Sequence, residues 1–173
     1  MPSPAHAQIV QAMLEDVLAA CIEVGRTYLV TPAPAPVGNG VEVVRDDGRG
    51  QGEAVVAGVA RVRQGPVLIV NSDLPCATSF DLEHVLASVP RAGLALVEAE
   101  DGTTNALALS TPELFEPLFG AGSAARYRRL GDSRSVLVPN LRDDVDTLAD
   151  LSRIGRRAGP RTQAAMLVLG LAA

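Results

Sequence analysis

The four residues Val67–Val70 (VLIV) are all apolar and are followed at once by Asn71, Ser72 and Asp73. A strand that is apolar on both faces must be covered on both faces, which is typical of a mostly parallel sheet between helices. Strand-like and helical segments alternate along the chain, which indicates an α/β fold with three layers. We expect strands at residues 26–30, 41–44, 67–70, 93–98, 106–109 and 136–138, and helices at 7–23, 53–63, 81–88, 123–130, 146–154 and 162–172.

The size and composition of the chain fit one domain, residues 1–173, with a core of Val, Leu and Ala. Apolar residues make up 47% of the sequence and aromatic residues only 3%. No apolar run approaches the roughly 18 residues of a membrane span, and no signal peptide is visible. We therefore expect a cytoplasmic protein that binds no membrane. The net charge of −5 argues against a nucleic-acid-binding surface.

The basic residues of the chain are all arginine, and lysine does not occur in it. A phosphate group must therefore be bound by arginine, by backbone N–H groups or by a metal ion. Cys21 and Cys76 show no metal-ligand spacing, so we expect two reduced, buried thiols. His6 and His84 are too few and too scattered for a zinc site.

Asp73 follows the buried strand directly, and Leu74-Pro75 then turns the chain away. In open α/β sheets, ligands bind beyond the carboxyl ends of the strands. A carboxylate at such an end can hold a hard cation such as Mg²⁺, which can bridge phosphate groups. The alternative is an Asp in a strand-to-helix turn that accepts hydrogen bonds from backbone N–H groups.

A second acidic candidate is the pair Asp144 and Asp146, which lie two residues apart. In an extended segment both side chains would point to one side and could reach one metal ion. The alternative is the acid-rich start of a helix, where carboxylates interact favourably with the helix macrodipole.

Three segments are candidates for anion binding. Small and hydroxyl residues in the turn at 101–107 offer N–H and O–H donors. The segment 119–127 (FGAGSAARY) places two glycines and Ser123 before a helix, and 48–53 (GRGQGE) places glycines before another. The alternatives are an ordinary turn, a loop with a Ser N-cap, and a glycine loop that lacks the spacing of a P-loop.

Four motifs occur in a fixed order: SDLP at residues 72–75, TNAL at 104–107, FGAGSAARY at 119–127 and DVDTLADL at 144–151. This ordered set resembles the 2-phospholactate or phosphoenolpyruvate guanylyltransferase family, whose pattern is roughly ADLP, GTNAL, FGxxSxxxH and DVDTPxDL. The segment MLEDVLAAC at 13–21 also looks like the first helix of that family. The resemblance therefore covers nearly the whole chain.

The resemblance implies a nucleotidyltransferase fold of the glycosyltransferase-A-like, Rossmann-related type. It implies that the phosphate of phosphoenolpyruvate or 2-phospholactate attacks the α-phosphorus of GTP and releases pyrophosphate, a step in coenzyme F-420 biosynthesis. Small molecules would then be the partners. The implied catalytic and Mg²⁺-binding residues are Asp73, Asp144 and Asp146. The implied acceptor-binding residues are Thr104, Asn105, Gly120 and Ser123, and the implied nucleotide-binding residues are Gly50, Gly52 and Glu53.

The chain departs from the family pattern in several places. Tyr127 replaces a histidine, Leu148 replaces a proline, and Glu53 replaces an amide. Family members begin with a strand and a lysine-bearing loop, whereas this chain starts at about the first helix. We therefore expect a gap in the sheet beside Val67–Val70, to be filled by re-pairing or by another subunit in a homo-oligomer.

Two alternatives to the guanylyltransferase function follow from these departures. One is a non-catalytic homologue that binds a phosphorylated acid or acts as a scaffold. The other is a different nucleotidyltransferase, for example one that uses CTP and a sugar phosphate.

Overall fold

The computed structural model describes residues 4–35 and 37–171. The strands are β1 (Thr27–Thr31), β2 (Val41–Arg45), β3 (Val67–Val70), β4 (Gly93–Glu98), β5 (Thr104–Leu109) and β6 (Asp132–Ser135). The α-helices are α1 (Pro4–Val24), α2 (Gln51–Val59), α3 (Ser79–Ala87), α4 (Ser123–Tyr127), α5 (Pro139–Arg142), α6 (Leu148–Ile154) and α7 (Pro160–Val168), and the 3₁₀ helices are η1 (Pro112–Leu114) and η2 (Gly155–Arg157). No helix of the described residues is long and apolar enough to cross a membrane.

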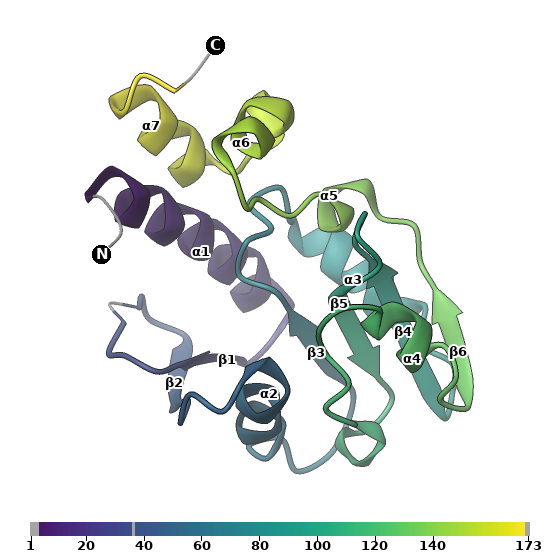
Figure 1. The fold of residues 1–173 in the computed structure, drawn as a ribbon. Coiled ribbons are helices and arrows are strands. Elements are labelled where there is room, and N and C mark those ends of the chain that lie inside the picture. Colours follow the sequence, from purple (N-terminus) through teal and green to yellow (C-terminus); the bar gives the residue numbers. More distant parts are fainter. Residues whose placement is uncertain (1–3, 36, 172–173) are drawn as a thin grey trace.

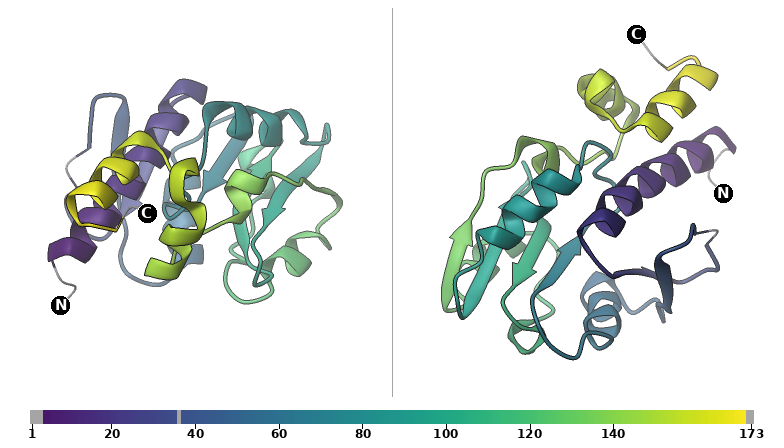
Figure 2. Two further views of the ribbon diagram at one scale, coloured as in Figure 1. Left: turned by 90° about the horizontal axis from the view of Figure 1, so that it is seen from above. Right: turned by 180° about the vertical axis from the view of Figure 1, so that it is seen from behind.

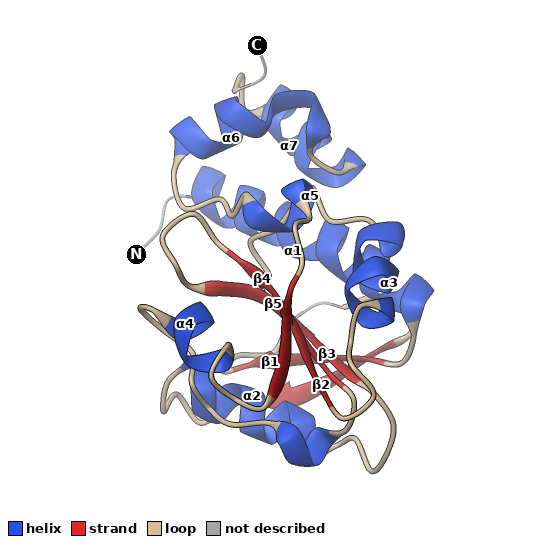
Figure 3. Cartoon of the chain, turned by 90° about the vertical axis from the view of Figure 1, so that its right-hand side faces the viewer, coloured by secondary structure: helices blue, strands red, loops and turns tan. Residues whose placement is uncertain are grey.

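The strands form two sheets, one with the order β1-β2 and one with the order β3-β5-β4-β6 (Figure 1). β1 and β2 are parallel, as are β4 and β6, whereas β5 is antiparallel to both of its neighbours. Helices cover both sides of the layer of strands, with α1 and α3 on one side and α2 and α4 on the other (Figure 3). The expected α/β class and layering are confirmed.

The two central strands of the larger sheet, β4 and β5, are buried on both faces, as their apolar sequences require. Alternate residues of β4 point to opposite sides, so Ala95 and Val97 pack with α1, α3 and α5, while Leu94 and Leu96 pack against α4. β5 alternates in the same way. The sheet therefore holds its loops and strand ends at fixed positions.

Strand β6 lies earlier in the chain than the sequence suggests. The expected strand at 136–138 is wrong, because the strand that pairs with β4 is the polar segment Asp132–Ser135. β6 is the last strand of its sheet and is mostly exposed, so it carries no apolar pattern. Only the N–H of Val136, which donates to the carbonyl of Leu96 at 2.9 Å, extends the pairing into the expected range.

A separate apolar cluster lies between the first and last helices of the described chain, where α7 packs along α1 (Figure 2). Asp16 of α1 is 5% exposed and accepts hydrogen bonds from the backbone N–H groups of Thr162 at 2.8 Å and Arg161 at 3.1 Å. Gly159 lies so close that a Cβ there would be 2.4 Å from Cγ of Asp16. Asp16 therefore anchors the first turn of α7.

A groove of about 990 Å³ separates the two sheets. Its walls include every residue of β1 and of β3, together with residues of α1 and α2. Within the described chain β1 pairs only with β2, and β3 only with β5. The expected gap beside Val67–Val70 thus lies between two edge strands that face each other.

Cys21 lines this groove, whereas Cys76 packs in the apolar cluster between α1 and α7, and the two form no disulfide with each other. Cys76 is buried and Cys21 is half-buried. Burial raises the pKa of the Cys21 thiol to about 11 and also raises that of Cys76. Both are therefore neutral thiols at physiological pH, and of the two expected buried thiols only Cys76 is fully buried.

Candidate active site

Asp73 lies just beyond the carboxyl end of β3, at the end of the groove between the sheets. Its backbone carbonyl accepts a hydrogen bond from the N–H of Val145 at 3.0 Å, which ties the acidic segment around Val145 to the end of β3. The side-chain oxygen Oδ1 of Asp73 is buried and has no hydrogen-bond partner among the described residues. A buried carboxylate oxygen without a donor is well suited to a cation.

The environment of Asp73 disfavours its negative charge. Burial, together with the nearby carboxylates of Asp144 and Asp146, raises the pKa of Asp73 to about 6. Burial likewise raises the pKa of Asp144, and Asp146 and Asp101 add to this effect. Such repulsion between like charges in a partly buried site is relieved when a cation binds.

Asp144 and Asp146 lie in the irregular segment between α5 and α6. They do not cap the following helix. That role belongs to Thr147 and Asp150, which form a reciprocal capping box at the start of α6. Asp144 is half-buried and Asp146 is exposed, so both carboxylates are available for a ligand.

An acidic cavity of about 230 Å³ lies next to this segment and is lined by Glu100, Asp101, Asp144, Asp146, Asp150 and Arg153. Arg153 donates to Asp143 at 2.7 Å and to Asp150 at 3.3 Å. The pKa of Asp143 is lowered because hydrogen bonds from Arg157 and Arg153 outweigh the effect of burial. Asp143 is therefore neutralised by arginines, whereas Asp144 and Asp146 are not.

The described residues contain no group of three His, Cys, Asp or Glu side chains that already forms a metal site. The carboxylates of Asp144 and Asp146 are close enough to raise the pKa of Asp73, but the three do not converge into a closed ligand set. Mg²⁺ usually keeps several waters and uses one or two carboxylates together with substrate phosphates. The unpartnered Oδ1 of Asp73 beside two further carboxylates fits that kind of open site.

Three of the residues that the resemblance assigns to acceptor binding have buried side chains. Thr104 and Ser123 are 1% and 0% exposed, and the Ser123 hydroxyl donates to the Thr104 hydroxyl at 3.0 Å. Asn105 is 1% exposed and donates to the carbonyl of Arg142 at 3.2 Å. These side chains connect β5, α4 and the acidic segment through hydrogen bonds. We therefore expect them to support the shape of the site from within the protein core.

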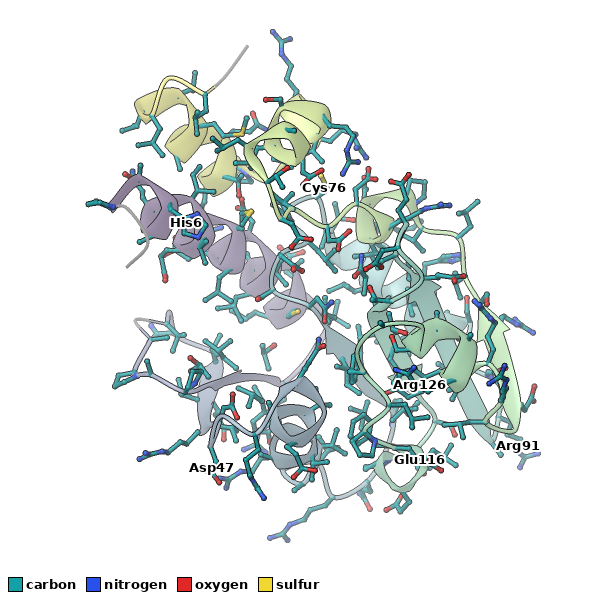
Figure 4. All side chains as sticks on the ribbon, viewed as in Figure 1. His6, Asp47, Cys76, Arg91, Glu116 and Arg126 are labelled. Atoms are coloured by element: carbon teal, nitrogen blue, oxygen red, sulfur yellow. The ribbon has the colours of Figure 1, made fainter. Side chains whose placement is uncertain are left out.

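An arginine of α4, Arg126, holds the loop that precedes this helix (Figure 4). The guanidinium of Arg126 donates to the carbonyls of Leu118 at 2.8 Å and Ala121 at 2.6 Å, and also contacts those between them. The hydroxyl of Tyr127, in the position of the family's histidine, donates to the carbonyl of Glu116 at 2.8 Å. The loop carbonyls are thus occupied, while the N–H of Gly120 has no acceptor among the described residues.

The glycine segment at 48–53 leads into α2, which begins at Gln51. Gly50 precedes the helix with φ of 103°, a conformation that favours glycine. Gly52 packs against Pro117, and a Cβ at Gly52 would lie 3.0 Å from Cβ of Pro117. Glu53 is paired with Arg49 at 3.6 Å, so its charge is partly compensated at the surface.

Sequence reasoning missed three side chains of this region: Gln51, Asn71 and Arg153. Asn71 lies between β3 and Asp73, and Gln51 donates to its Oδ1 at 3.0 Å. The position of Asn71 just after a buried strand was a usable signal, because polar residues there lie at the ligand-binding edge of the sheet. Nothing in the sequence linked Gln51 to Asn71, since the two are twenty positions apart.

Comparisons with solved structures support the fold. A structure from Desulfovibrio desulfuricans G20, described as a nucleotide-diphospho-sugar transferase, matches 96% of this chain and 84% of its own chain, with a TM-score of 0.72 at 17% identity. A hypothetical transferase from Thermus thermophilus matches 80% of this chain and 85% of its own, with a TM-score of 0.58 at 22% identity. At these identities the likeness shows a shared fold.

Sequence comparisons identify the family. The model of the MobA-like NTP transferase domain matches residues 8–138. A protein of Sphaerobacter thermophilus named phosphoenolpyruvate guanylyltransferase is 34% identical over 87% of this chain and 80% of its own length. One of the same name from Streptomyces scabiei is 40% identical over 71% of this chain, and the alignment spans 62% of that relative. The chain therefore belongs to the MobA-like NTP transferases, within the family of the phosphoenolpyruvate guanylyltransferases.

Proposed function

We propose that this protein transfers GMP from GTP to phosphoenolpyruvate or 2-phospholactate and releases pyrophosphate, as a step in coenzyme F-420 biosynthesis. The relatives named phosphoenolpyruvate guanylyltransferase support this proposal. The structural observation that carries it is the unpartnered, buried Oδ1 of Asp73 beside the carboxylates of Asp144 and Asp146. Cytoplasmic location and small-molecule substrates belong to the same proposal.

The roles of the residues follow from their placement. Asp73, Asp144 and Asp146 would hold Mg²⁺, which neutralises negative charge on the phosphate groups when bound. The free N–H of Gly120 would donate to the carboxylate or phosphate of the acceptor. The first turn of α2 at Gly50 and Gly52 would approach the nucleotide. With no lysine in the chain, the remaining phosphate contacts come from arginine and backbone donors.

Nucleotide turnover tests this proposal directly. We expect Mg²⁺-dependent pyrophosphate release from GTP only when phosphoenolpyruvate or 2-phospholactate is present, measured with a coupled phosphate assay. Omitting the acceptor is the control for simple hydrolysis. Pyrophosphate release from CTP with a sugar phosphate, or none with any nucleotide while phosphoenolpyruvate still raises the melting temperature, would support one of the two alternatives instead.

We also propose that an extended segment joined to the start of α1 completes the domain by filling the groove between β1 and β3. α1 and β1 run in opposite directions because only Gly25 and Arg26 connect them. A strand parallel to β1 in the groove would therefore end on the side where α1 begins, which gives a β-α-β unit. The groove supplies unpaired strand edges on both walls.

Amide hydrogen exchange checks this arrangement. In the 173-residue chain we expect the groove-facing amides of β1 and β3 to exchange fast, because they lack a partner. Protein expressed with the polypeptide encoded immediately upstream should protect these amides by at least roughly tenfold. The amides of β5, which is paired on both sides, serve as the internal control. Equal protection of β1 and β3 in both proteins would contradict the proposal.

A further inference from the structure

A chain of three side-chain amides runs from the first turn of α2 to the acidic segment. Gln51 donates to Oδ1 of Asn71 at 3.0 Å, and Asn71 donates to Oδ1 of Asn105 at 3.3 Å. Asn105 in turn donates to the carbonyl of Arg142 at 3.2 Å. We call these three residues the amide chain. It joins α2, the end of β3, the start of β5 and the last residue of α5.

The orientation of each amide is fixed by its neighbours. The backbone N–H of Asn71 donates to the carbonyl of Asn105 at 3.0 Å and extends the β3–β5 pairing by one residue. Asn105 is 1% exposed, so solvent cannot replace its protein partners. Because Asn105 accepts from Asn71 and donates to the carbonyl of Arg142, its oxygen and nitrogen cannot exchange places without losing both bonds.

The buried end of the amide chain acts on the candidate metal site. Its last amide, Asn105, binds the backbone that leads into the acidic segment. The carbonyl of Arg142, which accepts this bond, belongs to the backbone two residues before Asp144. The exposed end, Gln51, is the first residue of α2, next to Gly50 and Gly52.

We propose that Gln51 and Asn71 are positioning residues that orient Asn105 and, through its bond to the carbonyl of Arg142, the backbone segment that carries Asp144. They would couple the nucleotide-side turn of α2 to the metal-binding carboxylates, so that both halves of the site keep one relative position. This inference rests on the proposed function, because it takes Asp144 to be a cation ligand. Residues that orient metal ligands typically change metal affinity by about 10–100-fold when they are removed.

The structure separates this role from simple stabilisation. Gln51 is exposed, and its only side-chain hydrogen bond in the described chain is the one to Asn71. Its loss should therefore cost little folding stability. An effect on cation binding without an effect on unfolding would mark positioning, whereas a purely structural bond would change neither much.

The test is a Mn²⁺ titration of the nucleotide-free protein, followed by water-proton relaxation. Gln51→Met keeps the length of the side chain but removes the donor, and we expect it to weaken Mn²⁺ binding by about 3-fold. Asn71→Ala, which removes the middle of the amide chain, should weaken it by about 10-fold. Arg49→Ala is the matched control, because Arg49 lies in the same turn and pairs with Asp47 and Glu53 only.

The urea midpoint of Gln51→Met should match that of the wild type. The proposal is overturned if Mn²⁺ affinity is unchanged in Gln51→Met and Asn71→Ala, if Arg49→Ala weakens it equally, or if the wild-type protein binds no Mn²⁺. Because the titration contains no GTP, its outcome is independent of guanylyl transfer. If the variants bind Mn²⁺ more weakly but the wild-type protein releases no pyrophosphate, the positioning role of the amide chain would be supported and the proposed function would be refuted.

Discussion

Asp73→Asn is expected to lower kcat/KM for pyrophosphate release by about 10²–10³-fold, the cost of losing one group that stabilises transition-state charge. The same substitution should stabilise the folded protein at neutral pH. Burial raises the pKa of Asp73 from 3.8 to about 6, so ionising it in the folded state is unfavourable. This difference corresponds to about 3 kcal/mol, part of which the buried amide of Asn would offset.

The size of this stabilising effect depends on pH. Below pH 3.8 Asp73 is protonated in both states and contributes no penalty. As the pH rises from 3.8 to about 6, the unfolded state loses its proton first, and the folded state is progressively destabilised. Asp73→Asn and the wild type should thus have similar urea-unfolding free energies near pH 3.5, and the variant should be more stable at pH 7.5.

Asp132→Asn is the control for this experiment, because Asp132 is exposed on the edge strand β6. It should change neither activity nor the pH dependence of unfolding. Added Mg²⁺ should reduce the difference between Asp73→Asn and the wild type at pH 7.5, since a bound cation stabilises the ionised carboxylate. A variant that is less stable than the wild type at pH 7.5 would contradict the assignment of Asp73 as a strained, unpartnered carboxylate.

Asp16→Ala is expected to cost about 3 kcal/mol of unfolding free energy, because it removes a buried charged acceptor from two backbone N–H groups. The N–H groups of Thr162 and Arg161 would then have no acceptor in the first turn of α7. Urea unfolding at pH 7.5 measures the loss as a lower midpoint, and increased proteolysis after α6 would show that α7 has detached from α1.

Glu15→Ala provides a matched comparison on the same turn of α1. Glu15 lies 3.7 Å from Nε of Arg161, and both side chains are well exposed. Its removal should cost less than about 0.5 kcal/mol, as is usual for surface ion pairs. Similar losses for Asp16→Ala and Glu15→Ala would show that burial of Asp16 is not what anchors α7.

Local apolar pattern decided which parts of the fold could be predicted. Val67–Val70 and Gly93–Glu98 were predicted to the residue because both segments carry an apolar run bounded by turn residues. β6 was not, because an exposed edge strand of polar residues has no such pattern. The four-residue helix Pro139–Arg142 is too short to show helical periodicity and was not predicted.

The features of the candidate site also differ in whether a local sequence pattern could predict them. The rule that ligands bind at strand ends placed Asp73 correctly at the end of β3. The burial of Thr104 and Ser123 could not be predicted, because it depends on α4 packing against β5. The amide chain depends on contacts between residues twenty to thirty-seven positions apart, which no local pattern encodes.

The bond from Thr162 to Asp16 also affects how the protein is made. Asp16 leaves the ribosome 146 residues before its partner Thr162. At about 5–20 residues per second, translation takes roughly 7–30 s to cover that distance. During this interval α1 carries a carboxylate whose folded-state partners do not yet exist, so its apolar face cannot be sealed by α7. The packing of α7 against α1 must therefore follow the synthesis of α7.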